Sequence, residues 1–273
     1  MPPLSLAGAR AIVLAYAALL GACFGSFLSV CVWRIPRGKS IVRPRSHCPS
    51  CGQLIPWYFN IPVVSWLALR GRCASCKARI SPRYLLLELL TAALFMAAAW
   101  RYMDDLPVLM VMLVAVFGLE LGTFIDLDWY ILPDRVTIGG MALGLVASAL
   151  LPQLHGAETP DAGALRSCIG LVTGFGVLYL VARVGKAVYH KEAMGFGDVK
   201  LMGAVGALFG WVAVVFTLFV SSLLGSLVGI GLVLAGRRNL QGRIPYGPFI
   251  AAAALLWMFF GNELVVWYLR VLR

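Results

Sequence analysis

Long uninterrupted apolar stretches dominate the chain, and short polar segments separate them. A helix of about 20 residues crosses the hydrocarbon core of a bilayer. Stretches of roughly that length lie at 11–33, 84–100, 106–125, 136–152, 163–184, 199–210, 212–235 and 246–269. The pattern predicts an all-α polytopic membrane protein with about eight transmembrane helices. The sixth stretch is short and only Gly210 and Trp211 divide it from the seventh, so about seven spans is the alternative.

Composition agrees with a membrane protein. Of the 273 residues, 61% are hydrophobic and 13% are charged, against about 25% charged residues in soluble domains. The net charge of +11 is explained by cationic cytoplasmic loops, so we expect no nucleic-acid partner. The first stretch contains Ala15 and Ala17 inside the run rather than after it, so it should remain as a helix rather than be cleaved as a signal peptide.

One long polar stretch, residues 34–83, interrupts this pattern. It carries ten Lys and Arg residues and no Asp or Glu. Positive loops stay on the cytoplasmic side, so this loop should be cytoplasmic and the N-terminus should lie outside. We therefore divide the chain into a first transmembrane helix (1–33), a cytoplasmic loop domain (34–83) and a membrane domain (84–273).

The loop contains two CxxC pairs separated by 21 residues: Cys48, Cys51, Cys73 and Cys76. This spacing is typical of a zinc ribbon, with Gly52 and the small residues Ala74 and Ser75 permitting the tight turns. Disulfides or redox cysteines are the alternative, but a cytoplasmic location and the absence of a surrounding βαβ pattern argue against them. Four thiolates close the coordination sphere, so the predicted Zn²⁺ is structural. His47 is not needed as a ligand.

Acidic residues cluster at the ends of two apolar stretches. Asp126, Asp128 and Asp134 follow the third stretch, and Asp198 ends the Gly195-Phe196-Gly197-Asp198 sequence before the sixth. The chain crosses twice between the clusters, so they lie on the same membrane face. Two adjacent carboxyl groups share a proton and can activate a water as base and acid. Alternatively, Asp134 and Asp198 are helix N-caps, or the acids form a transporter's proton relay. Residue chemistry alone does not choose among Asp126, Asp128 and Asp134.

Taken together, these motifs resemble the type IV prepilin peptidases, bifunctional leader peptidase/N-methyltransferases of the GxGD aspartic class. The resemblance covers nearly the whole chain. Besides the doubled CxxC, the matching segments are Gly25-Ser26-Phe27-Leu28, Asn60-Ile61-Pro62, Ser65-Trp66-Leu67, Phe124-Ile125-Asp126, Leu132-Pro133-Asp134, Gly195-Phe196-Gly197-Asp198-Val199-Lys200 and Ile244-Pro245-Tyr246-Gly247-Pro248. The chain departs from the family at Ser29, where Asn is usual.

The resemblance implies an aspartic endopeptidase with Asp126 and Asp198 as the catalytic pair and Asp134 non-catalytic. It implies multi-pass insertion in the bacterial inner membrane, with the active site facing the cytoplasm. The substrates would be type IV prepilins and type II secretion pseudopilins, cleaved after glycine. Gly195 and Gly197 would let the substrate backbone approach, and Lys200 would support the active-site loop. Plain loop glycines and a lysine that follows the positive-inside rule are the alternatives.

A second activity is also implied, in which S-adenosylmethionine N-methylates the new N-terminal residue. The sequence contains no Gly-rich fingerprint of a Rossmann nucleotide site. The family's association of methylation with the cysteine loop points to Gly71, for which a plain turn glycine is the alternative. The alternatives for function are a peptidase without methyltransferase activity, a proton-coupled transporter and a non-enzymatic assembly factor docked through the loop. Membrane lipid is a partner in each case.

Overall fold

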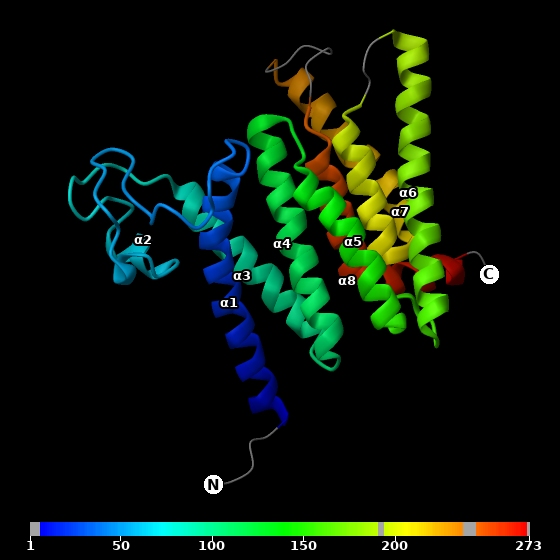
Figure 1. The fold of residues 1–273 in the computed structure, drawn as a ribbon, viewed down its shortest axis with the longest axis horizontal. Helices are drawn as coiled ribbons and strands as arrows, with labels where there is room; N and C mark the ends of the chain where they lie inside the picture. Colours follow the sequence, from blue (N-terminus) through cyan, green and yellow to red (C-terminus); the bar gives the residue numbers. More distant parts are fainter. Residues whose placement is uncertain (1–5, 191–193, 237–243, 272–273) are drawn as a thin grey trace. The chain divides into compact units, whose positions relative to one another are not determined.

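The computed structural model describes residues 6–190, 194–236 and 244–271, and their regular structure is helical (Figure 1). The chain forms two compact units, Met1–Phe117 and Gly118–Arg273. Six helices are long and apolar enough to cross a membrane. The all-helical, multi-pass architecture expected from the apolar stretches is therefore confirmed.

In the first unit, α1 (Leu6–Arg34) packs against α3 (Pro82–Tyr102) through glycines. A Cβ atom placed on Gly25 would lie 2.6 Å from the Cα atom of Glu88, and one on Gly21 would lie 2.7 Å from the Cα atom of Ala92. Small residues let two helix backbones approach closely, which is the usual basis of helix packing inside a membrane. The glycines of α1 thus set its contact with α3.

The polar loop between α1 and α3 contains only η1 (Trp57–Phe59) and α2 (Val64–Ala68) as regular structure. Glu88 of α3 anchors it, because its buried Oε2 accepts the backbone N–H of Val63 at 2.6 Å. Val63 has φ 62° and ψ −54°, a γ-turn conformation that is strained for a β-branched residue. The carboxylate of Glu88, costly in a transmembrane helix, is thus used to hold this turn.

The second unit contains the end of α4 (Leu106–Trp129), then α5 (Asp134–Leu150), η2 (Pro152–His155), α6 (Pro160–Tyr189), α7 (Phe196–Leu234) and α8 (Gly247–Val271). Its core lies around α7. The largest fully buried side chains there include Leu178 of α6, Met202, Val205 and Val214 of α7, and Ile250 of α8. The predicted third stretch ended at residue 125, but α4 continues through Trp129 and so contains Asp126.

The 39-residue helix α7 doubles back on itself at Gly210, which has φ 83° and ψ 174°. The Cγ2 atom of Val214 lies 3.0 Å from a Cβ atom placed on Gly206, whereas eight residues of straight helix span about 12 Å. In Figure 1 the yellow start and the orange end of α7 lie at the same end of this unit. The positive φ explains why glycine occupies the point that divides the sixth and seventh predicted stretches.

The contact between α6 and the first arm of α7 depends on Gly170 and Gly206. A Cβ atom on Gly170 would overlap the carbonyl oxygen of Gly206. We expect Gly170→Ala to lower the free energy of unfolding by about 2–4 kcal/mol, because the two backbones must separate. Thermal unfolding of the purified protein in detergent measures this. Gly176→Ala is the matched control, since nothing lies within 4 Å of its Cβ position, and an equal loss in both variants would contradict the prediction.

Candidate active site and zinc site

Asp126 and Asp198 are buried carboxylic acids at the ends of two helices. Asp126 lies in the last turn of α4 and Asp198 in the first turn of α7, with 6% and 8% of their surfaces exposed. The N-cap of α7 is Gly195, and the N-cap of α5 is Pro133. The alternative that Asp198 and Asp134 are N-caps is therefore wrong.

The side chain of Leu132 links the surroundings of the two acids. Its Cβ atom lies 2.8 Å from a Cβ atom placed on Gly197, and its Cδ1 atom lies 3.3 Å from one placed on Gly247. Gly247 donates its backbone N–H to Oδ2 of Asp126 at 3.0 Å. The start of α7, the α4–α5 connection and the start of α8 thus meet at Leu132, which brings Asp126 and Asp198 into the same region.

Three glycines allow the backbones around Asp126 and Asp198 to pack closely. A Cβ atom on Gly247 would lie 2.7 Å from Oδ2 of Asp126, and one on Gly195 would lie 3.2 Å from Oδ2 of Asp198. A side chain at Gly247 or Gly197 would displace Asp126 or Leu132. The sequence alone predicts no role for Gly247, whose only signal is its place in the Ile244–Pro248 segment.

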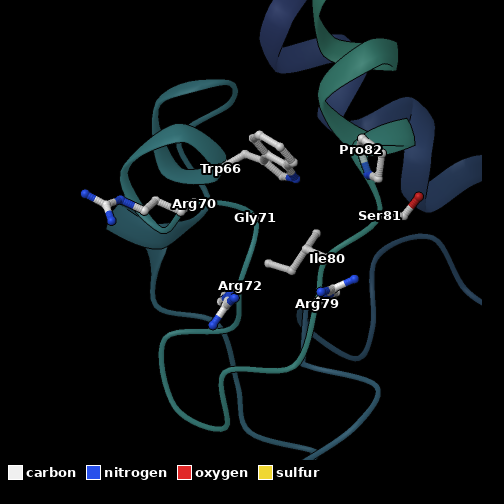
Figure 2. Close-up of a pocket in the computed structure, with 8 residues that line it drawn as sticks. All are labelled: Trp66, Arg70, Gly71, Arg72, Arg79, Ile80, Ser81 and Pro82. Atoms are coloured by element: carbon white, nitrogen blue, oxygen red, sulfur yellow. The ribbon is translucent and has the colours of Figure 1, made fainter.

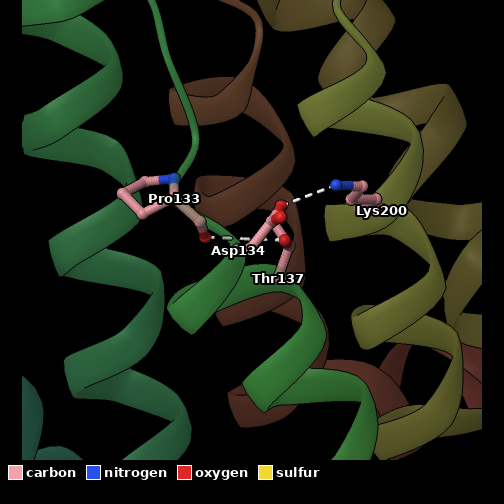
Figure 3. Close-up of polar contacts among 4 residues, drawn as sticks. All are labelled: Pro133, Asp134, Thr137 and Lys200. Atoms are coloured by element: carbon pink, nitrogen blue, oxygen red, sulfur yellow. Dashed lines mark hydrogen bonds and ion pairs between the residues drawn. The ribbon is translucent and has the colours of Figure 1, made fainter. Parts of the chain in front are cut away.

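Lys200 forms an ion pair with Asp134, with 2.6 Å between Nζ and Oδ1 (Figure 3). Its Nζ also lies 5.2 Å from the centre of the Phe196 ring. The side chain of Lys200 is 21% exposed and that of Asp134 is 63% exposed. Lys200, two residues after Asp198, therefore ties the start of α7 to the start of α5.

The four cysteines of the loop come together in the first unit. Their Sγ atoms all lie within 4.8 Å of one another, and those of Cys48 and Cys76 are 3.8 Å apart. A tetrahedral zinc site with Zn–S bonds of about 2.3 Å requires Sγ–Sγ distances of about 3.8 Å. All the cysteines are free thiols, so the disulfide alternative is wrong and the four residues fit a zinc ion.

Each CxxC pair forms the same turn. Gly52 donates its N–H to the carbonyl of Cys48, and Lys77 donates its N–H to the carbonyl of Cys73. Both Gly52 and Lys77 have positive φ, 71° and 61°. The second turn therefore depends on Lys77, the counterpart of Gly52, rather than on Ala74 and Ser75 as expected.

Backbone N–H groups favour a thiolate in the first turn. Those of Cys51 and Ser50 lower the pKa of Cys48 to about 6. The pKa of Cys76 is raised to about 11: the N–H of Ala78 lowers it, but burial and the three neighbouring thiols outweigh that effect. Four thiols this close resist full ionisation until a cation balances their charge, which is the chemistry that a zinc ion supplies.

Two further residues singled out in the sequence lie near this cluster. His47 is exposed, with its ring nitrogen 3.2 Å from the carbonyl of Arg45, and it is not part of the cluster. Gly71 has φ 64° and donates its N–H to the carbonyl of Trp66 at 2.8 Å. A Cβ atom on Gly71 would lie 2.8 Å from the Trp66 ring, and both residues line a cavity of about 420 Å³ (Figure 2).

Comparisons with known proteins point to one protein family over most of the chain. Residues 19–102 match the Bacterial Peptidase A24 N-terminal domain, and residues 113–230 match the Type IV leader peptidase family. The prepilin leader peptidase/N-methyltransferase of Aeromonas salmonicida (strain A449) is 40% identical, over 85% of this chain and 77% of its own length. The protein of the same name from Pseudomonas putida is 36% identical over 91% of both chains. No solved structure matches.

Proposed function

The chain belongs to the type IV leader peptidase family, and we propose that it cleaves the leader of type IV prepilins and type II secretion pseudopilins and then methylates the new N-terminus. The cleavage would follow a glycine, and S-adenosylmethionine would donate the methyl group. The observation that carries this proposal is the meeting of two buried carboxylic acids, Asp126 and Asp198, around Leu132.

Asp126 and Asp198 would perform the hydrolysis as a pair. One carboxylate takes a proton from a water molecule as the water oxygen attacks the glycyl carbonyl carbon. The other, protonated, donates a hydrogen bond to the carbonyl oxygen and later protonates the leaving amine. The bare backbone at Gly195 leaves room for an extended substrate backbone beside Asp198, whereas the space beside Gly197 is occupied by Leu132. The N–H of Gly247 holds Asp126 in place.

The positions of the acids favour a peptidase over a proton-coupled transporter. A proton relay places its acids near the middle of the membrane, where helices are broken. Asp126 is followed by only three residues of α4, and Asp198 is the third residue of α7. Both acids therefore lie near a membrane surface, where a prepilin leader peptide and water are accessible.

We assign that surface to the cytoplasmic face of the inner membrane, with eight crossings in which the two arms of α7 count separately. The charge of residues 34–83 supports this orientation. Since α5 and α6 lie between Asp126 and Asp198 in the chain, two crossings return the second acid to the face of the first. Residues 34–83 would act as the cytoplasmic domain and residues 84–273 as the peptidase domain.

Zinc would fold the cytoplasmic loop rather than take part in cleavage. Its four cysteine ligands leave no coordination position for a substrate. The methyltransferase activity is supported by the names of the relatives. Gly71 shapes the turn after α2, as a plain turn glycine does. A side chain at Gly71 would push against Trp66.

Incubation of the purified protein with a prepilin, with and without S-adenosylmethionine, tests both activities. Mass spectrometry of the product should show loss of the leader in both samples and one added methyl group only with S-adenosylmethionine. Cleavage without methylation would support the peptidase activity and exclude the methyltransferase activity. An intact prepilin in both samples would overturn the proposed function.

The Lys200–Asp134 pair should position Asp198 for cleavage. We expect Lys200→Met and Asp134→Asn each to lower kcat about fivefold, because a partly exposed ion pair contributes on the order of 1 kcal/mol. The double variant should be no worse than either single variant, since all three lack the same pair. Arg183→Gln, an exposed basic residue on α6, is the control. Fully additive losses would contradict a shared positioning role.

A further inference from the structure

The cavity beside Gly71 is lined by basic and apolar residues. Arg70, Arg72 and Arg79 contribute guanidinium groups, and Trp66, Ile80 and Pro82 contribute apolar surface. Figure 2 shows the ring of Trp66 opposite Pro82, with Ile80 below them and the side chain of Arg70 directed away. Residues 34–83 contain no acid, so the charge of this cavity is not balanced within the loop.

Arg72 and Arg79 lie opposite each other along the backbone, and Figure 2 shows their side chains pointing to different sides. They form an isolated antiparallel β-bridge, and like charges at paired positions repel. Neither guanidinium has an ion-pair partner within the described chain. A bound anion would remove this repulsion by drawing both guanidinium groups into hydrogen bonds with it.

The indole of Trp66 provides a third donor. Its Nε1 atom is buried and has no hydrogen-bond partner among the residues that the structure describes. A buried N–H without an acceptor is costly. The side chains that line the cavity thus offer several donors, while no acidic side chain lies among them. This pattern selects a ligand with several acceptor oxygens.

The cavity also lies at the start of a transmembrane helix. Ser81 is the N-cap of α3, and Pro82 is its first residue. On η1 and α2, Trp57, Val64 and Leu67 are large apolar residues that are 74%, 59% and 57% exposed. Exposed aromatic and aliphatic side chains beside basic residues are typical of the membrane–water interface. A ligand could therefore enter the cavity from the bilayer.

We propose that this cavity binds the phosphate group of an anionic phospholipid. Arg72, Arg79 and the Trp66 indole hold the phosphate oxygens, and Ile80 and Pro82 contact the glycerol backbone of the lipid. S-adenosylmethionine fits less well, because its sulfonium cation would lie among guanidinium groups with no acid to balance it. The bound lipid would fix the cytoplasmic loop against the inner leaflet.

Native mass spectrometry of the full-length protein, released from nanodiscs of mixed phosphatidylglycerol and phosphatidylcholine, tests this proposal. Wild type should retain phosphatidylglycerol selectively. The Arg72→Gln/Arg79→Gln variant should retain at most about one tenth as much phosphatidylglycerol as wild type, since each basic residue near an anionic surface strengthens lipid binding. Arg45→Gln, an exposed arginine of the same loop outside the cavity, should retain the wild-type amount. Equal retention in wild type and the double variant would overturn the proposal.

Trp66→Phe keeps most of the ring but removes the N–H, and it should also reduce retention. Zinc content confirms that the loop of each variant is folded, so that a lost lipid reports on the cavity. Competition separates the sources of the anion. Inorganic phosphate and S-adenosylmethionine at millimolar concentration should leave the bound phosphatidylglycerol in place. Displacement by inorganic phosphate would show a site for free phosphate, and displacement by S-adenosylmethionine a methyl-donor site; either would overturn the lipid assignment.

Discussion

Asp126→Asn and Asp198→Asn are each expected to lower the rate of prepilin cleavage about 1000-fold or more. Neither amide can take a proton from water, and removing one member of a cooperating acid pair disables the other. Asn has nearly the same volume as Asp and can still accept the hydrogen bond from Gly247 at position 126. Membrane insertion and thermal stability should therefore change little. Cleavage rates on a purified prepilin, measured beside unfolding temperatures, check this expectation.

Asp128→Asn is the matched control for the acid pair. Asp128 lies two residues after Asp126 on α4, but it is exposed rather than buried. Sequence chemistry did not distinguish it from Asp126, so the comparison tests the structural assignment directly. Cleavage should remain within about twofold of wild type, as is usual for a surface substitution. Full cleavage by the Asp126 or Asp198 variant would contradict the assignment of the catalytic pair. Complete loss of cleavage in Asp128→Asn would contradict it as well.

The second large effect is expected at the four-cysteine cluster. Purified protein should contain about one zinc per chain, and Cys48→Ala or Cys73→Ala should contain almost none, because structural zinc requires its full set of thiolates. Without zinc the loop has little apolar core, so trypsin should cut within residues 34–83, where ten Lys and Arg residues lie. Elemental analysis and limited proteolysis measure these two results.

The same variants separate the roles of the two units. Asp126 and Asp198 belong to the second unit, so leader cleavage should persist in part after zinc is lost, while methylation should fall if it uses residues 34–83. Cys168→Ala is the control, since Cys168 is an exposed thiol of α6 outside the cluster. Zinc retained at the wild-type level in Cys48→Ala would contradict the predicted site.

Much of the fold followed from local patterns. Apolar stretches predicted each long helix to within a few residues at most ends, because burial in lipid requires a continuous apolar segment. The four-cysteine cluster followed in the same way, since each CxxC turn holds two thiols side by side and the two turns then meet. The role of Lys77 was missed because nothing in the sequence marks a lysine that adopts a left-handed backbone conformation. A glycine such as Gly52 is itself a sign of that conformation.

What the sequence by itself determined is therefore the set of helices, the cationic loop with its four cysteines, and the two aspartate motifs. Only the tertiary structure decided how Asp126 is held by Gly247, 121 residues away, how Leu132 fits between Gly197 and Gly247, and that Lys200 pairs with Asp134. Hydrophobicity and ligand spacing are local properties that a chain displays in order. The register in which distant helices meet depends on side-chain packing, which no local pattern records.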